Sequence, residues 1–144
     1  MDYTFPEHLF YERVTHMWAL PESDTRIRVG IDPLGLSSLG ELAYLSLNAS
    51  QSRVQSGQPM GVLEAAKMTG EMIAPVNGTL VERNPAVLED PFVVNQDPYG
   101  KGWLAVIETE SWLEDSTNLV SGAEIPKWSA RELERYREQG WIEG

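Results

Sequence analysis

A single lysine between two strand-like runs is the residue of this chain best placed to carry chemistry. Residues 61–75 have the sequence GVLEAAKMTGEMIAP, and Lys67 is the only Lys or Arg between Arg53 and Arg83. Side chains in both runs alternate between two faces, as in half-buried strands. The small residues that flank the lysine favour a tight reversal. The pattern therefore predicts a hairpin that exposes Lys67 at its tip, within reach of a modifying enzyme.

Spacing alone leaves two interpretations of Lys67 open. Any hairpin can carry a solvated lysine that has no function beyond solubility. A lysine that carries a long flexible acyl group needs the same position, because a rigid hairpin lets the attached arm visit several active sites. The isolation of Lys67 from other basic residues favours attachment without deciding between the two.

The composition excludes several other kinds of chemistry. The chain has no cysteine, so it offers no disulfide, thiolate metal site or thiol nucleophile, and redox chemistry would need an added group. It also lacks a recognisable nucleophile motif, metal-ligand cluster or phosphate-binding loop, which argues against an independent enzyme. A non-catalytic carrier or binding protein is the expected class.

Charge and hydropathy limit the partners. Eleven Lys and Arg against 22 Asp and Glu give a net charge of -11, which repels nucleic acid and anionic membranes and favours basic partner surfaces. The N-terminus has no cationic start, and no stretch approaches the length of a membrane span. We expect neither nucleic acid nor membrane among the partners, and a cytoplasmic location.

Short apolar runs separated by Gly, Pro, Asn and Asp continue to about residue 110, which is typical of an all-β barrel or sandwich with brief strands. Residues 37–40 are expected to form a short helix or turn. Residues 84–88 should form a helical turn, with Asn84 as N-cap and Pro85 in the first helical position.

The pattern changes near the C-terminus. Ser129 and Glu132 have the spacing of a capping box, and Gly140 suits a helix stop, so a helix is predicted over 129–139. This helix is expected to dock on the barrel, with partner binding as the alternative. The predicted organisation is a domain over 1–113, a linker over 114–128 and a helical tail over 129–144.

Seven ordered motifs resemble the H-protein family, the lipoyl carriers of the glycine cleavage system. The similarity runs from about Tyr3 to Leu113, and the last motif is the most specific. The motifs are FPEHLF (5–10), VGID (29–32), LGELAY (39–44), VQSG (54–57), GVLEAAK (61–67), APVNG (74–78) followed by Asn84, and VNQDPYGKGWL (94–104).

This resemblance implies a mainly β, barrel-sandwich hybrid fold with lipoate joined by an amide bond to Lys67. It implies arm surroundings formed by a small set of residues: Gly61, Glu64, Glu71, Gly78 and Leu9. The implied partners are a lipoate ligase or octanoyltransferase, dihydrolipoamide dehydrogenase, and the enzymes that load and unload the arm. The lipoyl dithiolane would supply the redox group that the cysteine-free chain lacks.

Two departures from the family pattern bear on the cargo. Leu9 and Phe10 stand where the family usually has Glu and Trp, although Glu71 keeps a carboxylate at the family's Asp position. In glycine-cleavage carriers the acidic residue at the Leu9 position helps to hold a cationic aminomethyl group. An apolar Leu9 beside the arm would better suit neutral or anionic sulfur cargo.

The first expectation for the pathway is therefore heterodisulfide-reductase-like sulfur oxidation, with that reductase-like complex as the partner. The alternative is glycine cleavage, with glycine decarboxylase and aminomethyltransferase. Biotin attachment to Lys67 and an unmodified H-like binding module are the remaining possibilities. His8 is expected in the opening strand with a structural role, and His16 on the surface.

Overall fold

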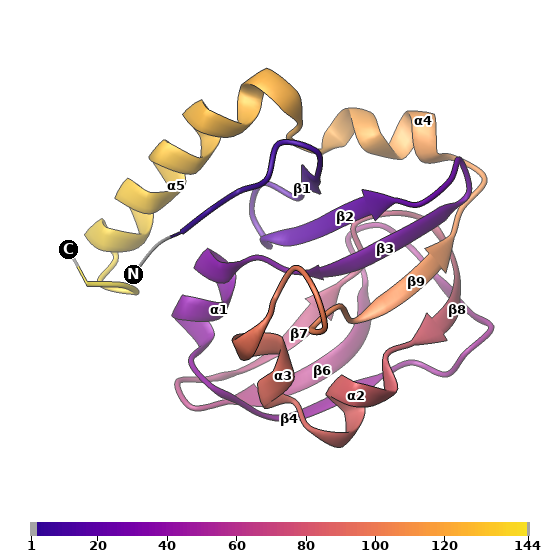
Figure 1. The fold of residues 1–144 in the computed structure, drawn as a ribbon, viewed down its shortest axis with the longest axis horizontal. Coiled ribbons are helices and arrows are strands. Elements are labelled where there is room, and N and C mark those ends of the chain that lie inside the picture. The colour runs from indigo at the N-terminus through magenta and orange to yellow at the C-terminus, as the bar shows by residue number, and fades with distance from the viewer. Residues whose placement is uncertain (1–2, 144) are drawn as a thin grey trace.

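Two antiparallel sheets form the body of the protein in the computed structural model, which describes residues 3–143 (Figure 1). The larger sheet has, in spatial order, β1 (Phe10–Tyr11), β2 (Met17–Pro21), β3 (Arg26–Ile31), β9 (Ala105–Glu108), β8 (Gly78–Arg83) and β5 (Ser52–Val54). The smaller sheet has β4 (Leu42–Leu47), β6 (Pro59–Ala65) and β7 (Thr69–Ile73) in that order. The predicted mainly β, barrel-sandwich hybrid fold is confirmed.

The main core lies between the two sheets. In the small sheet, Leu45, Leu63 and Met72 are at most 4 % exposed, and in the large sheet Ile27 and Ile107 are fully buried. Alternate residues of β6 face solvent instead, as the period of two in its sequence predicts. The small sheet therefore has one face in the core and one face open to solvent.

Three short helices close the ends of this core. They are α1 (Pro33–Leu39), α2 (Pro85–Glu89) and α3 (Phe92–Gln96). Asn84 caps α2 as predicted, since its side chain accepts a hydrogen bond from the Ala86 N–H and Pro85 follows in the first turn. The helical turn expected at 37–40 is the end of α1, which stops at Gly40 with φ of 88°.

The C-terminal part is folded from residue 112 onward. It contains α4 (Trp112–Asp115), 3-10 turns at Ser116–Asn118 and Gly122–Glu124, and α5 (Ile125–Glu138). The segment 114–128, expected as a linker, is thus helical over most of its length. Among residues 3–143 the model contains no helix that combines the length and the hydrophobicity needed to cross a bilayer.

The predicted start of the last helix at Ser129 is wrong. Pro126 occupies the first turn of α5, where its missing N–H leaves no helical hydrogen bond unmade, so the helix begins four residues earlier. Ser129 lies inside the helix and donates to the Pro126 carbonyl. The predicted stop is confirmed, because Gly140 adopts φ of 76° just beyond the helix.

The helix α5 covers a second apolar cluster next to the large sheet (Figure 1). Ile125 and Trp128 of α5 pack there against Leu9, Tyr11 and Trp18. The Trp128 indole N–H also donates to the Arg13 carbonyl at 3.1 Å. Burial of these large side chains holds α5 against the N-terminal segment.

A buried ionic network joins α5 to the barrel. His16 is completely buried, contrary to the expected surface position, and its two ring nitrogens lie 2.6 Å from Asp32 Oδ2 and 2.8 Å from Glu132 Oε1. The guanidinium of Arg135 makes a bidentate contact with the same Glu132 carboxylate, at 2.7 and 2.9 Å. Trp128 stacks on the imidazole with 5.1 Å between ring centroids. The network therefore joins residues 16, 32 and 132, which are far apart in the sequence.

Protonation of His16 stabilises this network. An imidazole that faces a carboxylate at each nitrogen can donate to both only in its charged form. Burial lowers the pKa of His16, but the hydrogen bonds and charges of Asp32 and Glu132 outweigh it and raise that pKa above 6.5. Burial likewise opposes ionisation of Glu132, yet the bonds from Arg135 and His16 lower its pKa below 4.5. Burial raises the pKa of Asp32, against the hydrogen bond and charge of His16. A cluster in which all four groups are ionised is neutral overall.

We predict that His16→Gln removes a pH dependence of stability. The folded-state pKa of His16 is raised, so its contribution is complete below about pH 6.5 and is lost as the pH rises through the folded value. At pH 6.5 the variant should lose about 3 kcal/mol of unfolding free energy, since Asp32 and Glu132 each lose a charged donor. Urea unfolding at pH 6 to 9 measures both effects. The matched control is His8→Gln, because His8 lies exposed in the turn before β1; equal pH slopes for the two variants would contradict the prediction.

Two glycines of the sheets lie where a side chain has no room. A Cβ on Gly61 of β6 would clash with the Ser46 carbonyl oxygen of β4 and lie 2.7 Å from Met72 Cε. A Cβ on Gly78 would clash with the Glu108 carbonyl oxygen. The absence of a side chain at these positions lets neighbouring backbones approach closely.

We predict that Gly61→Ala lowers the free energy of unfolding by about 1–3 kcal/mol, because β4 and Met72 must move to admit the methyl group. Gly70→Ala is the control in the same sheet, since its Cβ would meet only Leu63 Cδ1 at 3.8 Å. That change should stay within about 0.5 kcal/mol of the wild type. Denaturant unfolding of both variants is the measurement. Equal losses of unfolding free energy would show that the close backbone approach at Gly61 does not determine the cost of a side chain there.

Candidate functional site

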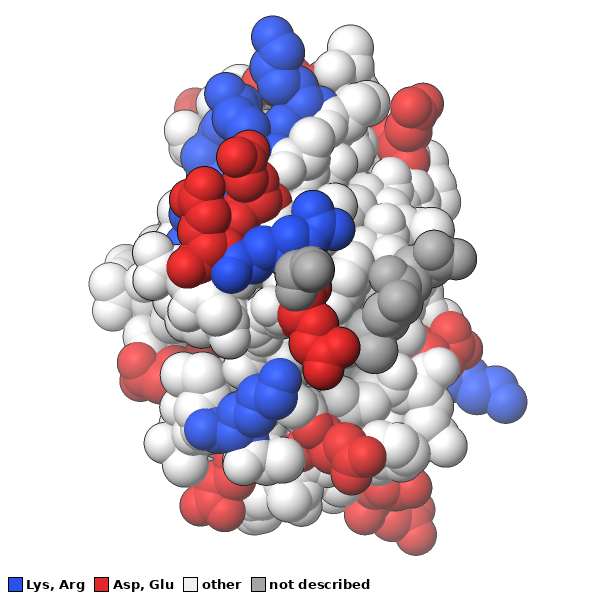
Figure 2. Space-filling model, turned by 90° about the vertical axis from the view of Figure 1, so that its left-hand side faces the viewer, with Lys and Arg blue, Asp and Glu red and all other residues white. Residues whose placement is uncertain are grey.

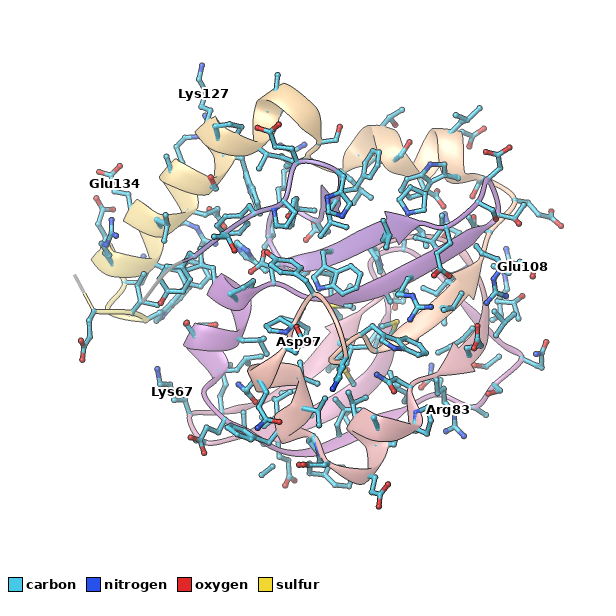
Figure 3. The ribbon with its side chains drawn as sticks, viewed as in Figure 1. Lys67, Arg83, Asp97, Glu108, Lys127 and Glu134 are labelled. Atoms are coloured by element: carbon cyan, nitrogen blue, oxygen red, sulfur yellow. The ribbon has the colours of Figure 1, made fainter. Side chains whose placement is uncertain are left out.

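Lys67 lies at the tip of the β6–β7 hairpin. Residues 66–68 connect the two strands, and the Ala65 N–H closes the turn on the Met68 carbonyl at 2.9 Å. The lysine side chain is exposed and lies at the edge of the protein beside α1 (Figure 3). The small residues around it keep the turn narrow, so nothing bulky shields the amine.

Backbone hydrogen bonds fix this tip to the segment that follows α1. The N–H of Lys67 donates to the Leu39 carbonyl at 3.0 Å, and the N–H of Ala66 donates to the Glu41 carbonyl at 2.9 Å. Between these acceptors, Gly40 adopts a positive φ of 88°, and a Cβ there would lie 3.2 Å from Ala66 Cβ and from Lys67 Cγ. The base of the lysine is therefore anchored, while the end of its side chain stays free to react.

The amine itself makes one hydrogen bond to protein. Lys67 Nζ donates to the Ser37 carbonyl at 2.9 Å, and no carboxylate of residues 3–143 lies within ion-pair distance of it. Acylation would replace this exposed bond by a neutral amide. The site therefore has no buried ion pair to break when Lys67 is modified.

A hollow beside Lys67, here called the lysine hollow, is built from α1, α3 and the C-terminal segment. Its charged side chains are two cations, Lys67 and Arg137, and two carboxylates, Glu41 and Glu143. Its other lining residues are Tyr3, Leu36, Ser37, Gly40, Asn95, Trp141 and Ile142. In Figure 2, basic and acidic side chains lie side by side both along the upper part of this face, over α5, and lower down.

A second hollow, here called the hairpin hollow, lies between β7, α1 and α5. Its wall is mostly apolar, with Met17, Ile31 and Leu63 from the sheets. Among residues 3–143, Glu71 is the one charged residue that lines it, and Tyr136 of α5 lines it as well. Burial raises the pKa of Tyr136 to about 12, so its hydroxyl stays protonated near neutral pH. Glu71 also borders the open face of the small sheet and is exposed, so its carboxylate lies at the rim of the hollow.

The structure brings together only part of the set that the sequence grouped around the arm. Glu64 and Glu71 share the open face of the small sheet with Tyr44, and Glu71 also lines the hairpin hollow. Gly61 and Gly78 lie at close backbone contacts within the sheets, which accounts for the absence of a side chain there.

The expected position of Leu9 beside the arm is wrong. Leu9 is 3 % exposed and belongs to the cluster beneath α5 with Ile125 and Trp128, and neither hollow is lined by it. Its apolar character thus serves packing of the C-terminal helix and gives no information about cargo. His8, expected in the opening strand, is exposed in a turn.

Several residues at the site were not predicted to lie there. Ser37, Gly40 and Glu41 support the hairpin tip although they precede Lys67 by 26 residues or more. Arg137 and Trp141 reach the lysine hollow from the far end of the chain. Gly40 is the one residue whose type hints at its role, since glycine after a helix favours a positive φ.

Comparisons with known proteins agree with this geometry. The sequence model of the family described as "Glycine cleavage H-protein" matches residues 9–132. The chain is similar to the glycine cleavage system H protein of Thermus thermophilus, 42 % identical over 99 residues that cover 69 % of this chain and 76 % of that protein. The corresponding protein of Acinetobacter baumannii is 40 % identical over 119 residues, covering 83 % and 94 %.

A solved structure has the same fold. The crystal structure of a glycine cleavage system H protein from Mycobacterium marinum superimposes with a TM-score of 0.76 at 28 % sequence identity, covering 88 % of this chain and 98 % of that chain. The sequence match over 9–132 includes the β6–β7 hairpin. The chain therefore belongs to the glycine cleavage H-protein family.

Proposed function

We propose that this protein is a lipoyl carrier of the glycine cleavage system and that Lys67 is its attachment residue. Glycine cleavage H proteins carry lipoate covalently on a lysine. The observation that carries the assignment to Lys67 is its exposed position at the tip of a hairpin whose backbone is anchored to Leu39 and Glu41. A rigid base combined with a free amine is what a mobile acyl arm requires.

The residues around Lys67 are compatible with an amide-linked arm. The amine gives up only an exposed bond to the Ser37 carbonyl, and the lysine hollow offers space and apolar surface next to it. When bound, lipoate supplies a dithiolane that cycles between disulfide and dithiol. The protein's own residues hold the base of the arm and set the charge around it, and no residue is assigned a catalytic role.

Glu71 supports glycine cleavage as the pathway. The aminomethyl cargo of that pathway is cationic. Glu71 is four residues from Lys67 and, among residues 3–143, is the one charged residue that lines the hairpin hollow, which it borders from the open face of the small sheet. Sulfur oxidation was favoured by an apolar Leu9 beside the arm, but Leu9 is buried in the cluster beneath α5. The relatives named above are described as glycine cleavage proteins, so that pathway has the stronger support.

The proposed partners follow from this pathway. A lipoate ligase or octanoyltransferase would attach the arm, and glycine decarboxylase, aminomethyltransferase and dihydrolipoamide dehydrogenase would act on it, in the cytoplasm. The net charge of -11 favours basic surfaces on those enzymes around their active-site entrances.

Incubation with a lipoate ligase, ATP and lipoate tests the attachment residue. We expect intact mass spectrometry to show one added lipoyl group on the wild type and none on Lys67→Ala, because the other lysines are not at a hairpin tip. Lys101→Ala is the matched control, since Lys101 is also exposed in a turn, and it should accept the group normally. Modification of Lys67→Ala, or a biotin-sized mass on protein from its native host, would contradict the assignment.

Glu71→Gln tests the pathway. The lipoylated wild type should accept an aminomethyl group from glycine and glycine decarboxylase, and the variant should release that group about five- to tenfold faster, because a partly exposed ion pair contributes roughly 1 kcal/mol. Glu64→Gln is the matched control, since Glu64 shares the open face of the sheet with Glu71 but does not line the hairpin hollow. Formaldehyde release measures the loss. Lack of loading by the wild type would sink the glycine-cleavage proposal and leave sulfur oxidation as the pathway to examine.

A further inference from the structure

The C-terminal turn after α5 forms one wall of the lysine hollow. Trp141 and Arg137 line that hollow together with Lys67, and Leu36 of α1 lines it as well. Figure 1 shows the end of α5 and the chain beyond it descending toward α1. An aromatic side chain is thereby placed next to the proposed attachment residue, in a part of the chain beyond the 9–132 family match.

Trp141 is held in a defined position. The N–H of Trp141 donates to the Tyr136 carbonyl at 2.9 Å, and the N–H of Gly140 donates to the Arg137 carbonyl at 3.0 Å. With Gly140 at φ of 76°, these bonds make the Schellman motif that reverses the chain after a helix. The indole also packs edge-on against the Tyr136 ring, with 5.1 Å between centroids.

The indole is nevertheless not buried. The guanidinium of Arg135 lies 5.4 Å from its centroid, so the ring has neighbours that hold it in place, but 42 % of Trp141 remains exposed. A large, positioned and uncovered aromatic surface beside a reactive amine favours an apolar group attached to that amine. The exposed part of the ring does not pack against any of residues 3–143.

The position of α5 keeps this surface in place. His16 contacts Glu132 and packs against Tyr136, with 5.2 Å between the ring centroids, and Glu132 binds Arg135. The same helix residues, Tyr136 and Arg135, contact the indole of Trp141. A continuous set of contacts therefore runs from the buried histidine to the wall of the lysine hollow.

We propose that Trp141 is a docking platform for the acyl arm on Lys67, at which the arm rests between visits to partner enzymes. The inference rests on the proposed attachment of lipoate to Lys67. The aliphatic part of the arm would lie against the indole and Leu36, and its sulfur atoms would make the contacts that sulfur prefers with aromatic rings. Acylation also removes the repulsion between Lys67 and Arg137 within the hollow.

An NMR comparison tests whether the arm reaches Trp141. Protein labelled with ¹⁵N is measured before and after octanoylation of Lys67 by a lipoate ligase with ATP and octanoate, and Trp141→Phe identifies the Trp141 indole N–H signal. We expect that signal to shift on octanoylation. The signal of Trp112 should stay in place, because Trp112 packs on Phe10 at the start of α4. An unmoved Trp141 signal on fully octanoylated protein would overturn the platform.

A chemical measurement tests the consequence for the arm. Reduction of the lipoyl disulfide by a water-soluble phosphine should be about fivefold faster in Trp141→Ala than in the wild type, because an undocked arm is more accessible. Leu113→Ala, which removes an apolar side chain that is 84 % exposed on α4, is the matched control and should match the wild type.

The outcomes separate the platform from the attachment. Equal reduction rates for Trp141→Ala and the wild type, with one lipoyl group on each by mass, overturn the platform and leave Lys67 as the attachment residue. Failure of Lys67 to accept any acyl group overturns the attachment and, with it, the platform.

Discussion

The hydrogen bonds between the hairpin tip and the chain after α1 determine the arrangement of the whole site. Two N–H groups of the tip, from Ala66 and Lys67, find their acceptors at Glu41 and Leu39, outside the hairpin. An isolated two-stranded hairpin is marginal in water, and its tip would ordinarily be its most mobile part. Anchoring the tip from outside removes that mobility at the backbone while leaving the lysine side chain exposed. The attachment point is thus rigid, and the freedom needed for transfer is left to the arm.

Besides the anchored hairpin tip, the site depends on a fixed C-terminal helix. The buried network around His16 holds that helix in place. Burying ionised groups is costly unless each finds hydrogen-bonding partners, and here His16 has a carboxylate at each nitrogen while Glu132 also receives Arg135. Such a network tolerates few alternative positions of α5, because a shift of the helix would separate charges that are shielded from water. Apolar packing alone, by Ile125 and Trp128, would permit more sliding. Polar bonding therefore sets the position of the helix, and apolar burial supplies much of the attraction.

Local signals in the sequence predicted the features that depend on neighbouring residues. Alternation in β6 and β7 located the hairpin and its lysine, and the Asn84–Pro85 pair located α2. The resemblance in ordered motifs identified the family and its fold. The predictions of the hairpin and of α2 succeeded because strand periodicity, capping and turns act over a few residues.

Features that depend on distant contacts were missed or misassigned. Ser129 and Glu132 have the spacing of a capping box, yet Glu132 points instead to His16, which is 116 residues away in sequence. Leu9 could be placed beside the arm only by ignoring α5, whose Ile125 and Trp128 cover it. Nothing local distinguishes a histidine that will be buried by a later helix from one that stays on the surface. The sequence therefore predicted the exposed lysine at the hairpin tip but not the walls around it.

The charges of the lysine hollow give acylation a second effect besides adding an arm. Before modification the hollow contains two cations, Lys67 and Arg137, and two carboxylates, Glu41 and Glu143. Amide formation neutralises Lys67, so the same surface then has an excess of negative charge at the place that partner enzymes approach. On a chain whose net charge is already -11, this change strengthens the attraction to a basic entrance and weakens the attraction to an acidic one. With the arm on Lys67, as proposed, the attaching enzyme would meet the balanced surface and the transfer enzymes the more negative one, and the loss of one charge would distinguish a carrier with an arm from one without.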